Sequence, residues 1–182
     1  MSSSRIRKLF PMKRAFRVFR KDRSGSVAVE FSFIAIPFFM ILFAIIETAV
    51  IFFANQALET ATQDSARLIM TGQAQQQSMT AQQFKSQVCS RLATFFDCAN
   101  GIYIDVRSYS SFGAITINQP IDNNKNFVDN FTYSPGGSGD IVVVRAFYQW
   151  PIAVTGLGYD ISNLNGGKRL LAATAAFRNE PW

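Results

Sequence analysis

The sequence predicts an α+β protein in three parts: a basic leader (1–25), a long helix (26–72) and a small exported domain (73–182). Two observations lead to this division. A long apolar run follows the leader and is long enough to cross a membrane. Beyond Asn100 the apolar residues begin to alternate, which is typical of strands. A helix followed by about four antiparallel strands predicts a sheet packed on helices.

The leader holds most of the positive charge. Residues 1–25 contain nine of the 18 Lys and Arg residues but only one of the 12 acidic residues, so the remaining chain is mildly acidic. A nucleic-acid-binding protein should display its basic surface on the folded domain, so we expect no nucleic-acid partner. The chain has no His and two Cys, which excludes His-based triads and His-containing zinc sites. We therefore predict no catalytic residue, no metal site and no cofactor.

The apolar run extends from Val27 to Ala54, and no Lys or Arg occurs between Arg23 and Arg67. About 20 apolar residues span a bilayer core, so the run suffices. The positive leader places the amino terminus in the cytoplasm and the rest of the chain outside. A cleaved secretory signal is the competing interpretation, but its apolar core is normally about 7–15 residues long. We expect a single-pass membrane anchor.

Two carboxylates interrupt the run. A charge at the centre of a membrane costs about 2.5–3.5 kcal/mol on insertion scales. Glu30 and Glu47 are separated by about 25 Å along a helix, so each can lie near one boundary of the membrane. Glu47 can then simply mark the outer interface. Pro37, seven residues after Glu30, should kink or loosen the helix.

The junction between leader and helix resembles a processing site. Gly25 ends the leader, and Glu30 and Phe31 follow at the fifth and sixth positions. This arrangement is similar to the prepilin peptidase site of type IV pilins. The resemblance implies cleavage after Gly25 on the cytoplasmic side, with Ser26 as the new amino terminus. It also implies that Glu30 pairs with the new ammonium of a neighbouring subunit, in keeping with the preference of helix N-termini for negative charge.

A wider resemblance extends to the TadE-like family, the minor pseudopilins of tight-adherence (Flp-type) pilus machines. The residues that carry it are Val27–Phe38, Glu47, Ala66–Arg67, Thr71–Gly72 and the ending Phe177–Pro181. The resemblance implies a pilin-like fold and a non-enzymatic role in assembling a pilus for surface attachment.

The same resemblance implies the partners and the location. The partners would be a prepilin peptidase, other pilin and pseudopilin subunits and the inner membrane, with the domain periplasmic or extracellular. Assembly would involve Glu30, Pro37 and Glu47. Major subunits of these pili are short helices without a globular part, so the additional domain of this chain favours a minor or accessory role.

Helical spacing continues beyond the membrane. One stripe contains Ala54, Leu58, Ala61, Ser65, Leu68 and Ile69, and Gly72 is a suitable stop. After a Gln-rich connector at 73–77, Thr80 and Gln83 form a capping-box pattern. The second helix that follows has apolar residues at Phe84, Val88, Leu92 and Phe95. An exported compartment permits disulfides, so we expect Cys89 and Cys98 to pair; a redox-active pair would normally have C-x-x-C spacing.

Four segments are candidates for strands. Ile102–Arg107 alternates as a half-buried strand does, and Ala114–Asn118 is a possible hairpin partner. Asp140–Trp150 has the strongest strand composition, whereas the alanines of Lys168–Phe177 fit a strand or a helix.

The intervening segment, 119–139, is rich in Asn, Asp and Gly. Turn chemistry explains this composition, and the spacing of its acids does not follow a calcium-binding loop.

Two other functions are compatible with these patterns. A non-assembling single-pass protein could bind a ligand or an envelope partner through its exported domain while its leader stays uncut. An exported enzyme is the second alternative, but the chain has no His and no recognisable nucleophile motif.

Overall fold

The computed structural model describes residues 24–92, 94, 96–155 and 158–182. It confirms the α+β class: a long apolar helix, short helices and a three-stranded antiparallel sheet. The chain divides between Phe43 and Ala44 into two compact units. The predicted leader lies outside the described residues, apart from its last two positions.

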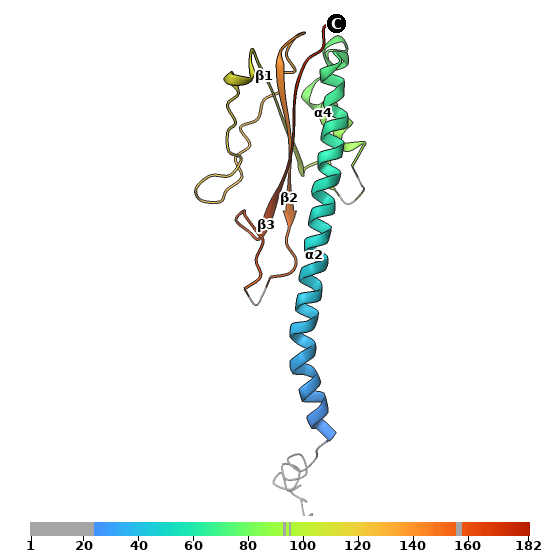
Figure 1. Cartoon of the computed structure of the whole chain (residues 1–182), viewed down its shortest axis with the longest axis vertical. Coiled ribbons are helices and arrows are strands. Elements are labelled where there is room, and N and C mark those ends of the chain that lie inside the picture. Colours follow the sequence, from blue (N-terminus) through green and yellow to red (C-terminus); the bar gives the residue numbers. More distant parts are fainter. Residues whose placement is uncertain (1–23, 93, 95, 156–157) are drawn as a thin grey trace, which may run out of the picture. The chain divides into compact units, whose positions relative to one another are not determined.

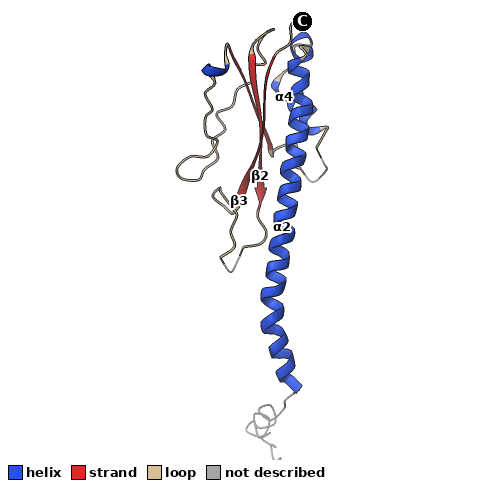
Figure 2. Cartoon of the chain, viewed as in Figure 1, coloured by secondary structure: helices blue, strands red, loops and turns tan. Residues whose placement is uncertain are grey.

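The helices are α2 (Ser24–Met70), α3 (Gln73–Gln76) and α4 (Ala81–Cys89), with a short 3₁₀ turn, η1, at Phe112–Ala114. The strands are β1 (Ile102–Tyr109), β2 (Ile141–Pro151) and β3 (Lys168–Arg178), shown in Figures 1 and 2.

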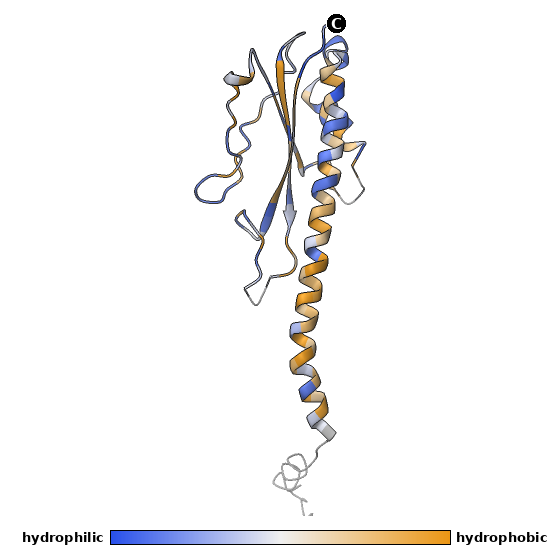
Figure 3. Cartoon of the chain, in the orientation of Figure 1, coloured by the Kyte–Doolittle hydropathy of each residue, from blue (hydrophilic) through white to orange (hydrophobic). Residues whose placement is uncertain are grey.

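The first unit, where described, is the amino-terminal part of α2, residues 24–43. Its surface is apolar: Phe31, Phe33 and Ile34 are each about two-thirds exposed or more, and Figure 3 shows the hydrophobic colouring. Among the described residues, one helix is long and apolar enough to cross a membrane, and only 11% of its most apolar stretch is buried. That exposure distinguishes it from the core helix of a soluble protein.

In the second unit, α2 and α4 cover one face of the sheet (Figure 1). The predicted stripe on α2 is confirmed, because Ala54, Leu58, Ala61, Ser65 and Ile69 are all buried. They pack against α2-facing residues of the strands and, near the end of α2, against α4. The apolar side chains of α2 are therefore exposed in the first unit and buried in the protein core in the second.

The sheet has the order β1-β2-β3, with β2 in the centre. Tyr148 pairs with Ile102 on one side and with Leu171 on the other. The predicted strands at 102–107, 140–150 and 168–177 are confirmed, and the last is a strand rather than a helix. The number of strands differs, because the fourth candidate, Ala114–Asn118, is not a strand: it begins in η1 and continues as an irregular segment.

Part of the segment 115–139 covers the face of the sheet opposite α2. Phe127 and Phe131 pack around Phe147 of β2, with ring centroids 6.3 and 5.1 Å away. Residues 132–134 also pair with the outer edge of β1 through backbone bonds to Val106. This cover explains why β1 is not half-buried as predicted: its far face is enclosed as well.

A buried carboxylate and two arginines hold part of the segment 115–139 against the sheet. Asp105 of β1 is 1% exposed and accepts hydrogen bonds from Arg145 Nη2 at 2.6 Å, Arg107 Nε at 3.0 Å and Thr132 N at 2.9 Å. The two arginines also donate to the backbone carbonyls of Asn118 and Asn130. Burial by itself would raise the pKa of Asp105, but the Thr132 N–H and the two guanidinium groups outweigh it and hold that pKa below its ordinary value.

The segment after α2 is confirmed in part. Thr80 caps α4 with a complete capping box involving Gln83, as predicted. The Gln-rich connector, however, contains the single turn α3. Helix α4 ends at Cys89 and not at Leu92 or Phe95, the second of which lies outside the described residues. The disulfide between Cys89 and Cys98 is present and joins the end of α4 to the turn before β1.

Candidate processing and assembly site

The predicted processing residues lie in the first two turns of α2. Ser26 Oγ donates a hydrogen bond to Glu30 Oε1 at 3.0 Å, one helical turn away, and both side chains are exposed. Phe31 is 67% exposed. Gly25 is open as well, because a Cβ built at this position would meet no atom within 4 Å. The four residues therefore form one accessible surface.

The local backbone suits a proteolytic site. Gly25 is the second residue of α2, where a helix frays most easily. Glycine inside a helix is less favourable than alanine by about 1 kcal/mol, so unwinding this end for a peptidase costs little.

Cleavage after Gly25 would change the electrostatics of Glu30. The first turn of α2 contains no acidic residue, and Glu30 is the seventh residue of the helix. With Ser26 as the first residue, Glu30 would become the fifth. The carboxylate would then lie close to the positive end of the helix dipole and to the new ammonium group.

Pro37 lies inside α2, which continues through it without interruption. A proline in a helix interior lacks the N–H that would bond the carbonyl four residues earlier, in this case that of Phe33. Pro37 therefore removes one backbone hydrogen bond from α2.

Glu47 has different surroundings from Glu30. Its Oε1 accepts the backbone N–H of Ala153 at 2.6 Å, and both of its oxygens lie 3.1 Å from the N of Val154. One turn of α2 is tied to the same connection between β2 and β3, because the Thr48 and Tyr159 hydroxyls lie 2.6 Å apart. These contacts were not predicted from the sequence. The features that could have indicated them are an acid near the end of an apolar run and a distant apolar segment to which no role was assigned.

The carboxyl terminus closes onto the end of α2. The backbone N of Glu180 donates to the carbonyl of Met70, and the Trp182 ring lies so close to Gly72 that a Cβ there would clash with it. Gly72 has φ +77°, as expected for a glycine that ends a helix. Two segments that carried the family resemblance, Thr71–Gly72 and Phe177–Pro181, therefore meet in the structure.

Asn179 is the centre of this contact. It is 2% exposed, and its side-chain amide donates to the carbonyls of Pro135 and Gly137. The terminal strip is therefore bonded both to α2 and to the turn before β2.

The Asn- and Asp-rich segment uses its acids for turns. Asp122 Oδ1 accepts the backbone N–H groups of Asn124 and Asn126, and its Oδ2 accepts the Asn126 side-chain amide. These contacts agree with the turn chemistry expected of the segment.

These features define a class of protein: a chain with one candidate membrane-spanning helix and a small α+β domain built on the continuation of that helix. Residues 25–67 match the family model described as TadE-like protein, which confirms the resemblance seen in the sequence. The matched region begins at Gly25. Neither the curated proteins nor the solved structures compared with the chain gave a significant match. The family that this model describes is associated with tight-adherence pilus systems and is generally non-enzymatic.

Proposed function

We propose that this chain is a minor pseudopilin of a tight-adherence (Flp-type) pilus, cleaved by a prepilin peptidase after Gly25 and anchored in the inner membrane by α2. The observation that carries the proposal is an exposed apolar helix whose first described turn contains the proposed scissile bond and whose second turn bears an accessible carboxylate, Glu30. The family match covers this same region. The leader is cytoplasmic in this proposal and the domain periplasmic or extracellular.

Glu30 sets the register between subunits. A carboxylate in lipid is costly unless it is paired, and the partner of Glu30 among the described residues is a neutral serine hydroxyl. The ammonium of a neighbouring subunit supplies the missing opposite charge. Because a shift by one turn would leave the charges unpaired, the pair favours one axial position of adjacent helices.

Glu47 and Pro37 contribute differently to assembly. Glu47 is held by the chain's own backbone, so we assign it to positioning the domain on the helix at the outer interface. Pro37 leaves a carbonyl of α2 without its helical partner, and small local adjustments there would let adjacent helices pack closely.

Mass measurement after co-expression with the cognate peptidase tests the cleavage. The product should lose the mass of residues 1–25 when the peptidase is present, and Gly25→Phe should abolish this loss. Gly113→Phe, at another glycine whose Cβ position is open, is the control and should be cleaved normally. An unchanged mass for the native sequence would contradict the proposal and would favour an uncut single-pass protein.

A second measurement separates cleavage from assembly. Glu30→Gln keeps the shape of the side chain and removes its charge. We expect normal loss of the leader but a severe reduction in pili on the cell surface, because the charge pair between subunits is absent. Normal piliation by the Glu30→Gln variant would refute the role in register.

A further inference from the structure

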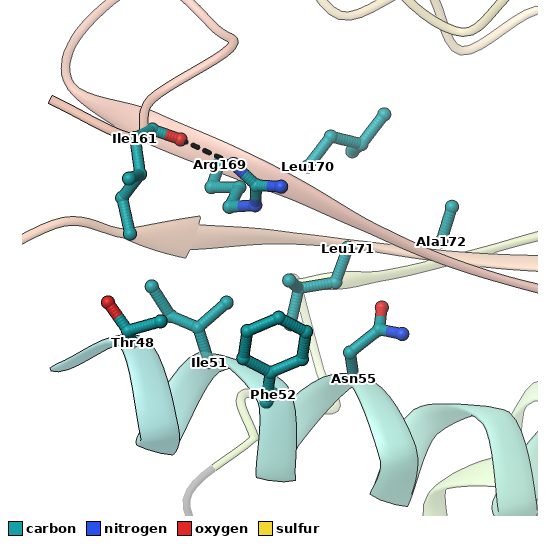
Figure 4. Close-up of a pocket in the computed structure, with 9 residues that line it drawn as sticks. All are labelled: Thr48, Ile51, Phe52, Asn55, Ile161, Arg169, Leu170, Leu171 and Ala172. Carbon is teal, nitrogen blue, oxygen red and sulfur yellow. Dashed lines mark hydrogen bonds between the residues drawn. The ribbon is translucent and has the colours of Figure 1, made fainter. Parts of the chain in front are cut away.

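A pocket lies between α2 and β3 within the second unit. It has a volume of about 470 Å³. Thr48, Ile51, Phe52 and Asn55 form its α2 side, and Ile161 and Arg169 lie opposite, as shown in Figure 4. The wall is mainly apolar. Among the described lining residues, Arg169 is the charged one, and none is acidic.

Arg169 is directed toward α2 by the strand register. Side chains alternate along β3, and Arg169 shares the face of Leu171 and Ala173, which pack in the core beneath α2. Its Nη1 donates to the carbonyl of Ile161 at 2.7 Å. The ion pairs found among the described residues join Asp105 to Arg107 and to Arg145, and neither includes Arg169. The guanidinium group is therefore held in place without an anionic partner.

The nearest acid on the facing helix does not supply that charge. Glu47, one residue before the pocket-lining Thr48, directs its carboxylate to the backbone N–H groups of Ala153 and Val154. Asp160 on the adjacent connection accepts from the backbone N of Ser162. Both carboxylates are thus engaged by the β2–β3 connection.

The pocket lies at the outer end of the candidate membrane span. Phe52 and Phe53 are 72% and 64% exposed, and Asn55 and Gln56 follow them. Twenty residues counted from Phe31 end at Val50, so the boundary between hydrocarbon and headgroups falls within the α2 side of the pocket. Aromatic and basic side chains gather at such boundaries, and Trp150, Tyr159 and Lys168 occur at the same end of the sheet.

We propose that this pocket binds a glycerophospholipid of the outer half of the membrane, with the lipid phosphate on Arg169. A guanidinium group forms strong paired hydrogen bonds with phosphate, and the side-chain amide of Asn55 adds a neutral polar group to the same pocket. Ile51 and Phe52 give the start of the acyl chains an apolar wall. A helix of another subunit would have to bring an anionic group to the same depth, whereas every phospholipid carries a phosphate there.

The inference rests on the membrane placement in the proposed function and is independent of cleavage. The full chain, expressed without the peptidase, is inserted into nanodiscs of phosphatidylethanolamine and phosphatidylglycerol (3:1), extracted in mild detergent and examined by native mass spectrometry. We expect one phospholipid to stay bound to the native chain. Arg169→Gln should reduce the retained lipid about tenfold, because it removes charge-assisted bonds to the phosphate.

Two variants complete the test. Arg178→Gln is the matched control: Arg178 also lies on β3 and donates to one backbone carbonyl, that of Gly139, and this variant should retain lipid. Asn55→Phe fills the pocket from its α2 side while leaving the charge in place, so it should lose lipid with the disulfide and circular dichroism unchanged.

The outcomes are distinguishable from failure of the proposed function. A native chain that does not insert into nanodiscs contradicts the membrane anchor itself. A chain that inserts but retains no phospholipid overturns the lipid site alone. Equal retention by native, Arg169→Gln and folded Asn55→Phe proteins also overturns it.

Discussion

Glu30 and Glu47 show how one residue type acquires two roles on a single helix. Glu30 is exposed, and it accepts a hydrogen bond from a serine hydroxyl one turn away. Glu47 receives backbone N–H groups from a segment more than a hundred positions later in the chain. An ionised acceptor bonded to N–H groups is far less costly near lipid than an unpaired one. Glu30 is therefore available to a partner molecule, and Glu47 is committed to its own domain.

The effect of Glu47 on stability can be measured directly. Glu47→Ala leaves the N–H groups of Ala153 and Val154 without their acceptor, so we expect the free energy of unfolding to fall by about 1–3 kcal/mol. Denaturant titration of the full chain in detergent measures this change. Glu59→Ala, on the same helix with a side-chain partner at Gln63, should cost well under 1 kcal/mol. Equal losses in the two variants would contradict the specific role of Glu47.

Gly72 is a second position where one residue decides the local structure. Gly72→Ala places a methyl group against the Trp182 ring in a backbone conformation that disfavours side chains. We expect destabilisation of about 1–3 kcal/mol, measured as a lower midpoint of thermal unfolding. Gly113→Ala is the control, since its Cβ position is open and it has no positive φ. A Gly72→Ala protein as stable as the control would show that Trp182 does not pack there in solution.

At the scale of elements, the disulfide ties α4 to the turn that begins the sheet. Replacing both cysteines by serine increases the number of conformations that the unfolded chain can adopt. The closed loop is short, with a sequence separation of 9, so the chain-entropy model gives a loss of about 2–3 kcal/mol. Urea unfolding of native and double-serine proteins tests this value. No difference between them would mean that α4 is held by Phe84 and Val88 in the core alone.

Local patterns predicted the elements that depend on local chemistry. The capping box at Thr80, the buried stripe of α2 and the strand at 140–150 were read correctly because each has a period or a cap in its own sequence. The strand expected at Ala114–Asn118 was wrong because that segment follows the far face of the sheet instead of pairing with it. An alternating pattern cannot show what covers the second face.

The candidate site shows the same difference between residues that are neighbours in the sequence and contacts that join distant segments. Gly25, Ser26, Glu30 and Phe31 are neighbours on one helix, so a resemblance over a short stretch of sequence was enough to predict them together. The contacts of Glu47 and the closure of Trp182 on Gly72 join distant segments, and no local pattern encodes them.

For the whole molecule, the Asp105 cluster connects three segments that are separate in the sequence. The carboxylate bonds β1 to β2 and to the cover at 115–139. Its pKa is lowered in the folded protein from the ordinary value of 3.8. A lowered folded pKa gives stability that is fully present above the unfolded pKa and is lost as pH falls through the folded pKa.

We therefore expect the urea midpoint of the native protein to fall as the pH decreases below about 4. Asp105→Asn should be less stable at pH 7 and should show a weaker pH dependence in this range. Asp122 and Asp160 also have lowered pKa values from turn hydrogen bonds, and they titrate in both proteins, so the difference between the two curves isolates Asp105. Parallel curves would contradict the assignment.

The docking of the terminal strip at Asn179–Trp182 onto the end of α2 has a consequence for biogenesis. The helix is synthesised early, but the residues that complete its far end follow much later in the chain. The domain can therefore acquire its final packing only after that strip has been made. A purification handle fused behind Trp182 would crowd this closure.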